Sequence, residues 1–138
     1  MMKRYNVIAV YSPDEKKLLM CRRAKNPYKG MLNFVGGKIE EGETDDAAAY
    51  RELREETGIT DDAIRLTHVM DFIYYQSDIV LMLYAGRLMH DVMLTEEENS
   101  LLWVDRTEDF CDVNRFAGDC NIEHMLRQIE FYRAETLA

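Results

Sequence analysis

Several kinds of residue are scarce in this chain, and each scarcity excludes a class of protein. The three cysteines are odd in number and lack Cys-x-x-Cys spacing, so we expect free thiols in a reducing cytoplasm. No apolar run approaches the ~20 residues that a membrane helix needs. The first strand-like segment, over residues 5–11, is too short and too polar for a signal peptide. We therefore predict a cytoplasmic protein with no membrane partner.

Basic residues are scarce relative to acidic ones. Lys and Arg number 17 against 26 Asp and Glu, for a net charge of −9. This balance disfavours long nucleic acid, which binds basic faces. A small polyanion can still bind where a divalent metal and a few local Lys or Arg residues neutralise it. The sequence leaves a monomer and a homodimer equally open.

The chain length and apolar content predict one folded domain. A domain of 138 residues buries roughly two-thirds of its unfolded surface, and 47% hydrophobic residues fit a globular core. There is no repeat, low-complexity segment or linker, so the domain is expected to span residues 1–138. Hydrophobic periodicity predicts strands over residues 5–12, 18–23, 32–35, 64–75, 79–88 and 101–104, and helices over 45–57 and 121–136.

The first predicted helix carries three carboxylates on one face. Thr44 is a good N-cap and Gly58 a good C-cap for it. Glu52, Glu55 and Glu56 stand at i, i+3 and i+4, within an arc of roughly 100°. Like charges at this spacing repel, so we expect a cation between them. Such dense oxygen ligands suit Mg²⁺ or Mn²⁺ rather than zinc.

The segment around this helix resembles the Nudix box, the signature of the Nudix hydrolases. The box reads G-x5-E-x7-R-E-U-x-E-E-x-G-U, where U is aliphatic. A merely solvated acidic helix is the alternative, but it does not explain the glycines and the arginine in register. Every specified position matches: Gly37, Glu43, Arg51, Glu52, Leu53, Glu55, Glu56, Gly58 and Ile59.

The resemblance implies a fold, a cofactor and a set of roles. The fold is α/β, a Nudix-type α/β/α sandwich with a mixed central sheet, and the cofactor is Mg²⁺, with Mn²⁺ as a substitute. Arg51 orients the carboxylates, and Glu43 ties the loop to the helix. Resemblance to MutT-type enzymes favours Glu52 as general base, while another box glutamate or one on a later loop stays open. The implied metal ligands are Gly37 through its carbonyl, Glu52, Glu55, Glu56 and a later glutamate.

The later glutamate is expected just before the strand that contains the single tryptophan. Residues 96–98 are all glutamate, and we choose Glu98, five residues ahead of Trp103. A solvated acidic loop is an equally open interpretation. Among the basic residues, Arg22 and Arg23 point to opposite faces of a strand, so only one can bind phosphate. Arg23 matches the phosphate-binding arginine of MutT-type enzymes; Lys38 either stabilises the departing phosphate or lies on the surface.

Two further positions bear on the substrate. Asn33, within residues 32–38, matches an asparagine that reads the base in purine-sanitising Nudix enzymes. Asp119 matches a place where Asn or Asp recognises the purine, although it is equally suited to cap the last helix. The resemblance thus implies hydrolysis of a nucleoside triphosphate such as 8-oxo-dGTP to monophosphate and pyrophosphate. Alternatives are hydrolysis of ADP-ribose or a dinucleoside polyphosphate, and a non-catalytic nucleotide-sensing module.

Overall fold

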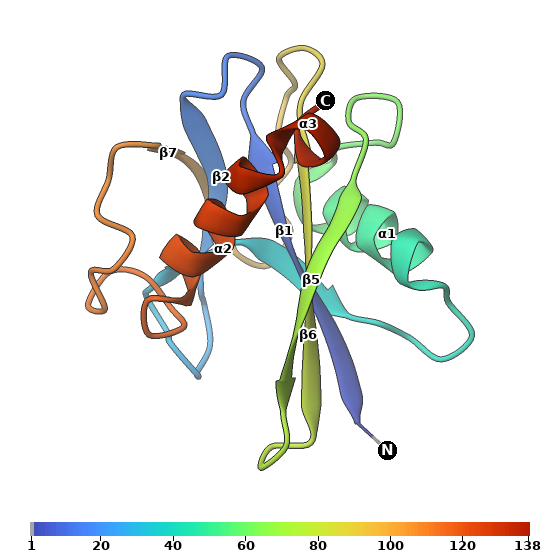
Figure 1. The fold of residues 1–138 in the computed structure, drawn as a ribbon, viewed down its shortest axis with the longest axis vertical. Coiled ribbons are helices and arrows are strands. Elements are labelled where there is room, and N and C mark those ends of the chain that lie inside the picture. The colour runs from blue at the N-terminus through green and yellow to red at the C-terminus, as the bar shows by residue number, and fades with distance from the viewer. Residues whose placement is uncertain (1) are drawn as a thin grey trace.

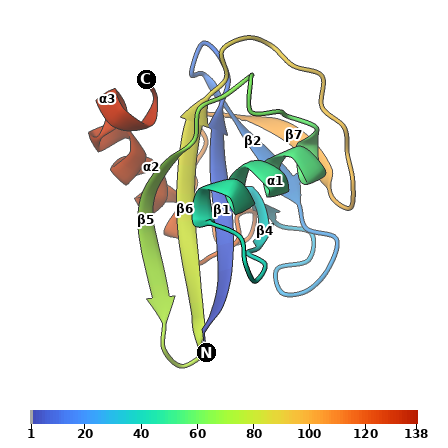
Figure 2. The ribbon, with the colours of Figure 1, turned by 90° about the vertical axis from the view of Figure 1, so that its right-hand side faces the viewer.

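A seven-stranded mixed sheet lies between helices in the computed structural model, which describes residues 2–138. Strands β1 and β6 are parallel and the other pairs are antiparallel. Helix α1 covers one face, and α2 and α3 cover the other (Figures 1 and 2). The predicted α/β/α sandwich with a mixed sheet is confirmed. In chain order the elements are β1 (Lys3–Tyr11), β2 (Lys17–Arg22), β3 (Leu32–Asn33), β4 (Val35–Lys38), α1 (Asp45–Thr57), β5 (Thr67–Tyr74), β6 (Ile79–Arg87), β7 (Ser100–Asp105), α2 (Asn121–Phe131) and α3 (Arg133–Thr136).

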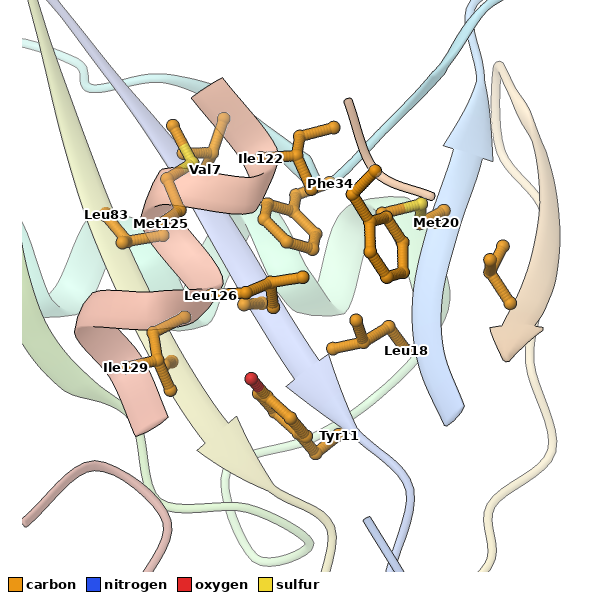
Figure 3. Close-up of a cluster of buried hydrophobic side chains, with 14 of the residues drawn as sticks. Val7, Tyr11, Leu18, Met20, Phe34, Leu83, Ile122, Met125, Leu126 and Ile129 are labelled. Carbon is orange, nitrogen blue, oxygen red and sulfur yellow. The ribbon is translucent and has the colours of Figure 1, made fainter. Parts of the chain in front are cut away.

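Strand β1 divides the core into two layers because its side chains alternate between the two faces of the sheet. Ile8 and Val10 pack with the α1 side, whereas Val7 and Tyr11 pack with the α2 side. Figure 3 shows the second layer, where one face of α2 lies over Val7 and Tyr11. Burial on both faces explains why β1 reads as a nearly continuous apolar run. Across the described residues 2–138, no helix is long and apolar enough to cross a membrane.

The boundaries of α1 agree with the capping residues. The Thr44 hydroxyl accepts a hydrogen bond from the Ala47 N–H at 3.2 Å. Gly58 takes a left-handed φ of 80°, and its N–H donates to the Arg54 carbonyl at 2.9 Å. Both predicted caps are therefore confirmed, and they fix where the glutamate-bearing face begins and ends.

The predicted strand over residues 32–35, which we expected Gly36 and Gly37 to end, is wrong in its bounds, since β3 ends at Asn33 and β4 continues through both glycines. They lie within β4 and pair with Val7 and Asn6 of β1. The physical reason is close approach, since a Cβ on Gly36 would lie 2.1 Å from the Asn6 carbonyl oxygen. Gly36 thus lets β4 pack closely against the central strand β1.

The C-terminal segment also differs from its prediction. The expected helix over 121–136 divides at Tyr132 into α2 and α3. The Thr136 hydroxyl donates to the carbonyls of Ile129 and Tyr132, which tightens this turn. The N-cap of α2 is Cys120 rather than Asp119, so the helix-cap alternative for Asp119 is wrong. The apolar face of α2 is confirmed, with Ile122, Met125, Leu126 and Ile129 buried, whereas Tyr132 is half exposed.

The expectation of three free thiols is wrong for two of them. Cys111 and Cys120 form a disulfide, while Cys21 is free and buried in β2. This disulfide joins the two ends of the segment 111–120, which leads directly into α2. Sequence spacing alone did not indicate this fold of the loop.

Candidate active site

Arg51 donates hydrogen bonds to three glutamates of the box. Its Nε and Nη2 donate to the two carboxylate oxygens of Glu43 at 2.6 and 2.8 Å. Its Nη1 donates to Glu52 and to Glu55, each at 3.0 Å, and its Nη2 also reaches the Lys38 carbonyl at 3.1 Å. A planar guanidinium suits this fork of contacts. Arg51 therefore supplies part of the positive charge that we expected between the glutamates.

The Arg51 contact sets the protonation of Glu43. Hydrogen bonds from the guanidinium, and then from the Glu40 N–H, lower the pKa of Glu43 from 4.5 to about 2. Glu43 is therefore ionised at neutral pH and ties the loop to α1. The pKa of Arg51 rises in turn, chiefly through its hydrogen bonds to Glu43.

Glu52 is a buried carboxylate packed against the glycine that opens the box. Only 8% of it is exposed, and a Cβ on Gly37 would lie 2.4 Å from the Glu52 carboxyl carbon. Burial raises the pKa of Glu52, and Arg51 opposes part of this rise. The geometry explains why this position in β4 requires glycine.

Glu56 differs from its neighbours because it lacks a compensating partner. Within the described part of the chain, no group donates a hydrogen bond to its carboxylate and no Lys or Arg pairs with it. Burial raises the pKa of Glu56 most, followed by the charges of Glu52, Glu98 and Glu97. A half-buried carboxylate surrounded by like charges is costly unless a cation neutralises it.

The loop at residues 96–98 approaches this end of α1. Glu97 and Glu98 both act on the pKa of Glu56, whereas Glu96 accepts a hydrogen bond from the Leu101 N–H at 2.6 Å. Glu98 forms an ion pair with Lys25 at 3.0 Å. The structure therefore brings two of the three glutamates toward the box, and Glu97 joins Glu98 as a possible ligand.

The donor chemistry fits a hard divalent cation, although the side chains are not arranged around one. Among residues 2–138, no group of three or more His, Cys, Asp or Glu side chains is placed to hold a metal ion. The reason is that Glu52 and Glu55 turn to Arg51. The unpartnered carboxylate of Glu56, beside buried Glu52, still offers the all-oxygen ligands that Mg²⁺ and Mn²⁺ prefer.

A crevice of about 200 Å³ opens beside Glu56. Arg23 lines it, and the Arg23 Nε donates to the Pro27 carbonyl at 2.6 Å. Arg22 lies elsewhere, with its Nη1 bonded to the Gly30 carbonyl at 2.9 Å. The exposed side chain of Lys38 lines a separate hollow beside residues 40–43, which favours its surface role.

A larger cavity of about 590 Å³ lies toward α2. Asn33 and Asp119 both line it, so the structure brings these two predicted residues together. The Tyr28 hydroxyl donates to the Asp119 carboxylate at 3.4 Å, and Tyr74 supplies a second aromatic wall. The two cavities share Tyr5, Val7, Asn33 and Leu81 as wall residues.

Sequence reasoning missed Asn6, Tyr28 and Tyr74. Asn6 carried a signal, since it is an amide within an otherwise apolar strand. The two tyrosines carried none, because only the folded chain brings the loop after β2 and the end of β5 to one cavity.

Comparison with known proteins identifies the family. A model of the NUDIX domain matches residues 2–119. The chain belongs to the Nudix family. This Nudix chain is 33% identical over 104 residues to the CTP pyrophosphohydrolase of Escherichia coli (strain K12), covering 74% of this chain and 76% of that protein. It is 33% identical over 82 residues to the 8-oxo-dGTP diphosphatase of the same strain, covering 58% and 64% respectively.

A solved structure supports the fold of this Nudix chain. It comes from a study of MutT from Aliivibrio salmonicida and Vibrio cholerae, and matches with a TM-score of 0.71 at 21% identity. The match covers 96% of this chain and 100% of that one. At this identity the likeness concerns the fold alone. With the family match, the predicted enzyme class, a Nudix hydrolase, is confirmed.

Proposed function

We propose that this Nudix hydrolase is an Mg²⁺-dependent nucleoside triphosphate pyrophosphohydrolase that prefers a purine such as 8-oxo-dGTP. It releases the monophosphate and pyrophosphate. One observation carries the proposal: the crevice that holds Glu56 and Arg23 shares Asn33 with the cavity that holds Asp119. A single nucleotide can thus place its phosphates near the box glutamates and its base near α2.

In this proposal the box holds the metal. Glu52, Glu55, Glu56, the Gly37 carbonyl and Glu98 are the ligand candidates, with Mg²⁺ as the ion and Mn²⁺ as its substitute. When bound there, the ion would neutralise phosphoryl charge and lower the pKa of a water. Glu56 is partly buried and lies among the charges of Glu52, Glu97 and Glu98, so an ion bound there would relieve their repulsion.

The chain's own residues supply a proton acceptor and a phosphate contact. Glu52 is the proposed base, since burial raises its pKa toward the working pH of a proton acceptor. The Arg51 contact to Glu52 Oε1 orients that carboxylate and leaves the other oxygen for the proton. Arg23 faces the crevice and binds phosphate through its guanidinium.

The base is read by a complementary pair. The Phe34 N–H occupies Asn33 Oδ1 at 2.8 Å, so Asn33 offers its Nδ2 as a donor. Asp119 offers carboxylate oxygens as acceptors. A guanine-type edge has a carbonyl acceptor and N–H donors, which this pair matches. Tyr28 and Tyr74 provide aromatic faces for stacking on the base.

A second substrate is favoured by one comparison. The CTP pyrophosphohydrolase aligns over more of this chain than the 8-oxo-dGTP diphosphatase does, so CTP is the alternative. ADP-ribose and dinucleoside polyphosphates are further candidates of the same chemistry. We also propose that the enzyme acts in the cytoplasm, where nucleotide pools lie, and that residues 1–138 form one domain as a monomer or homodimer.

The test is a substrate panel with Mg²⁺. The panel comprises 8-oxo-dGTP, dGTP, CTP, ADP-ribose and diadenosine tetraphosphate, with pyrophosphate and phosphate measured separately. We expect the highest kcat/KM for 8-oxo-dGTP, with pyrophosphate as product. A preference for CTP would select the alternative, and hydrolysis of ADP-ribose alone would contradict the triphosphate proposal.

A further inference from the structure

Asn6 is a buried amide in the middle of β1 that uses only one of its two polar groups. The residue is 2% exposed. Its Oδ1 accepts a hydrogen bond from the Gly37 N–H at 3.0 Å. Its Nδ2 is buried and has no hydrogen-bond partner among the described residues. Buried amide groups are nearly always paired, so this donor requires an explanation.

The orientation of the Asn6 amide is fixed by Gly37. A backbone N–H needs an acceptor, and turning the amide over would set Nδ2 against it. The Oδ1 must therefore face Gly37, and the Nδ2 group is the one left without a partner among the described residues. An apolar residue would suit the strand if packing were the whole role of this position.

The residue that carries the unpaired donor lines the crevice beside the box. Asn6 shares that crevice with Arg23 and Glu56. Strand alternation puts Asn6 on the α1 face, whereas its neighbours Tyr5 and Val7 also line the larger cavity. Asn6 therefore belongs to the crevice beside the box, and its two neighbours in β1 are walls that this crevice shares with the larger cavity.

The chemistry of this position selects the kind of ligand. An amide N–H₂ donates and does not ligate a metal ion, and the Asn6 oxygen is already occupied by Gly37. The missing partner is thus an acceptor. The non-bridging oxygens of a phosphoryl group are strong acceptors without donors, and Arg23 on the same crevice suits the same charge.

We propose that Asn6 Nδ2 donates a hydrogen bond to a non-bridging oxygen of the phosphoryl group attached to the nucleoside. This inference rests on the proposed nucleotide hydrolase function and adds a substrate-binding residue outside the box. The contact holds the phosphoryl group next to the base cavity while the remaining phosphates reach the box. It also stabilises the monophosphate product after cleavage.

Calorimetric binding with two pairs of ligands tests the contact. The ligands are 8-oxo-dGMP with 8-oxo-deoxyguanosine, and CMP with cytidine, all with Mg²⁺. In Asn6→Leu we expect affinity for the preferred monophosphate to fall about tenfold or more, with affinity for its nucleoside unchanged. Asn6→Asp keeps an acceptor for the Gly37 N–H but replaces the donor with an anion, so the monophosphate should bind more weakly still.

Asn33→Ala is the matched control, since it removes another amide of the same crevice. Because Asn33 is proposed to read the base, this variant should weaken monophosphate and nucleoside binding alike. The same parallel loss in both Asn6 variants would assign Asn6 a structural or base-reading role and overturn the inference. Unchanged monophosphate affinity in Asn6→Asp and Asn6→Leu would also overturn it while the proposed function stands. If wild type binds none of the ligands and hydrolyses no nucleotide in the panel, both fall.

Discussion

The Arg51 guanidinium donates two hydrogen bonds, at 2.6 and 2.8 Å, to the carboxylate of Glu43, which lies eight residues earlier in the sequence. The same guanidinium reaches Glu52 and the Lys38 carbonyl. It therefore fixes the loop before α1 and the orientation of a buried carboxylate at once. This dual contact makes Arg51 a positioning residue whose loss should affect structure and activity together.

The first prediction concerns Arg51→Lys. An ammonium cannot reproduce the forked contacts, so Glu52 should lose its orientation. We expect kcat/KM to fall roughly tenfold to a hundredfold, as for other outer partners of metal ligands. Steady-state kinetics would measure this, and Arg127→Lys on the surface of α2 is the matched control. Equal activity in the two variants would contradict the positioning role.

The second prediction concerns acid stability. The pKa of Glu43 is lowered from 4.5 to about 2 by its hydrogen bonds to Arg51 and the Glu40 N–H. A lowered pKa in the folded state stabilises the protein above the unfolded pKa, and this stabilisation is lost as the pH falls from about 4.5 to about 2. Glu43→Gln should lower the melting temperature at neutral pH and flatten its fall in that window. A melting curve of unchanged slope would argue against the bonded pair.

The third prediction concerns Glu56→Gln. This change removes the carboxylate that the chain itself leaves unpartnered, so the ion loses a ligand. Turnover should fall at least roughly 10²–10³-fold, as when one preorganised electrostatic group is lost. The melting temperature without metal should hold or rise, because repulsion from Glu52, Glu97 and Glu98 is relieved. Near-wild-type turnover at saturating Mg²⁺ would contradict the metal assignment, and Glu123→Gln on α2 serves as control.

The fourth prediction couples metal binding to stability and pH. Millimolar Mg²⁺ or Mn²⁺ should raise the melting temperature of wild type, and EDTA should reverse the change. Because burial raises the pKa of Glu52 and Glu56, protons compete with the ion at pH values above the ordinary glutamate pKa of 4.5. The metal-induced rise should therefore shrink as the pH falls toward that value. Glu56→Gln should show a smaller rise at every pH, and thermal scans without any metal effect would exclude the site as drawn.

The fifth prediction concerns the base. Asn33→Ala and Asp119→Ala should each raise KM for the preferred purine nucleotide and narrow its advantage over pyrimidines. The loss per contact is expected to be about 1–3 kcal/mol, or roughly tenfold to a hundredfold in kcat/KM. Asp119 lies before the N-cap position of α2, but it has a left-handed φ of 53°, so Asp119→Ala should lower the melting temperature modestly through backbone strain alone. Unchanged purine-to-pyrimidine ratios in both variants would end the purine assignment.

The family, the fold class and helix α1 follow from the amino-acid sequence alone. Fixed spacing put Glu52, Glu55 and Glu56 on one helical face, and capping chemistry at Thr44 and Gly58 set the ends of that helix. These are local properties, governed by helical geometry and short-range hydrogen bonds. They hold wherever the segment lies in space, so they could be predicted before the fold was known.

Which side chains meet depends on how the whole chain folds. Strand pairing set Gly37 against Asn6 and left the Asn6 Nδ2 without a partner. The path of the chain brought Asn33 and Asp119 to one cavity. It also placed Cys120, not Asp119, at the N-cap position of α2. The same path turned Glu52 and Glu55 toward Arg51. Within residues 2–138, Glu56 was left without a cationic partner, close to other negatively charged glutamates. Such outcomes depend on contacts between distant segments and on competition for one guanidinium, which neither spacing nor propensity encodes.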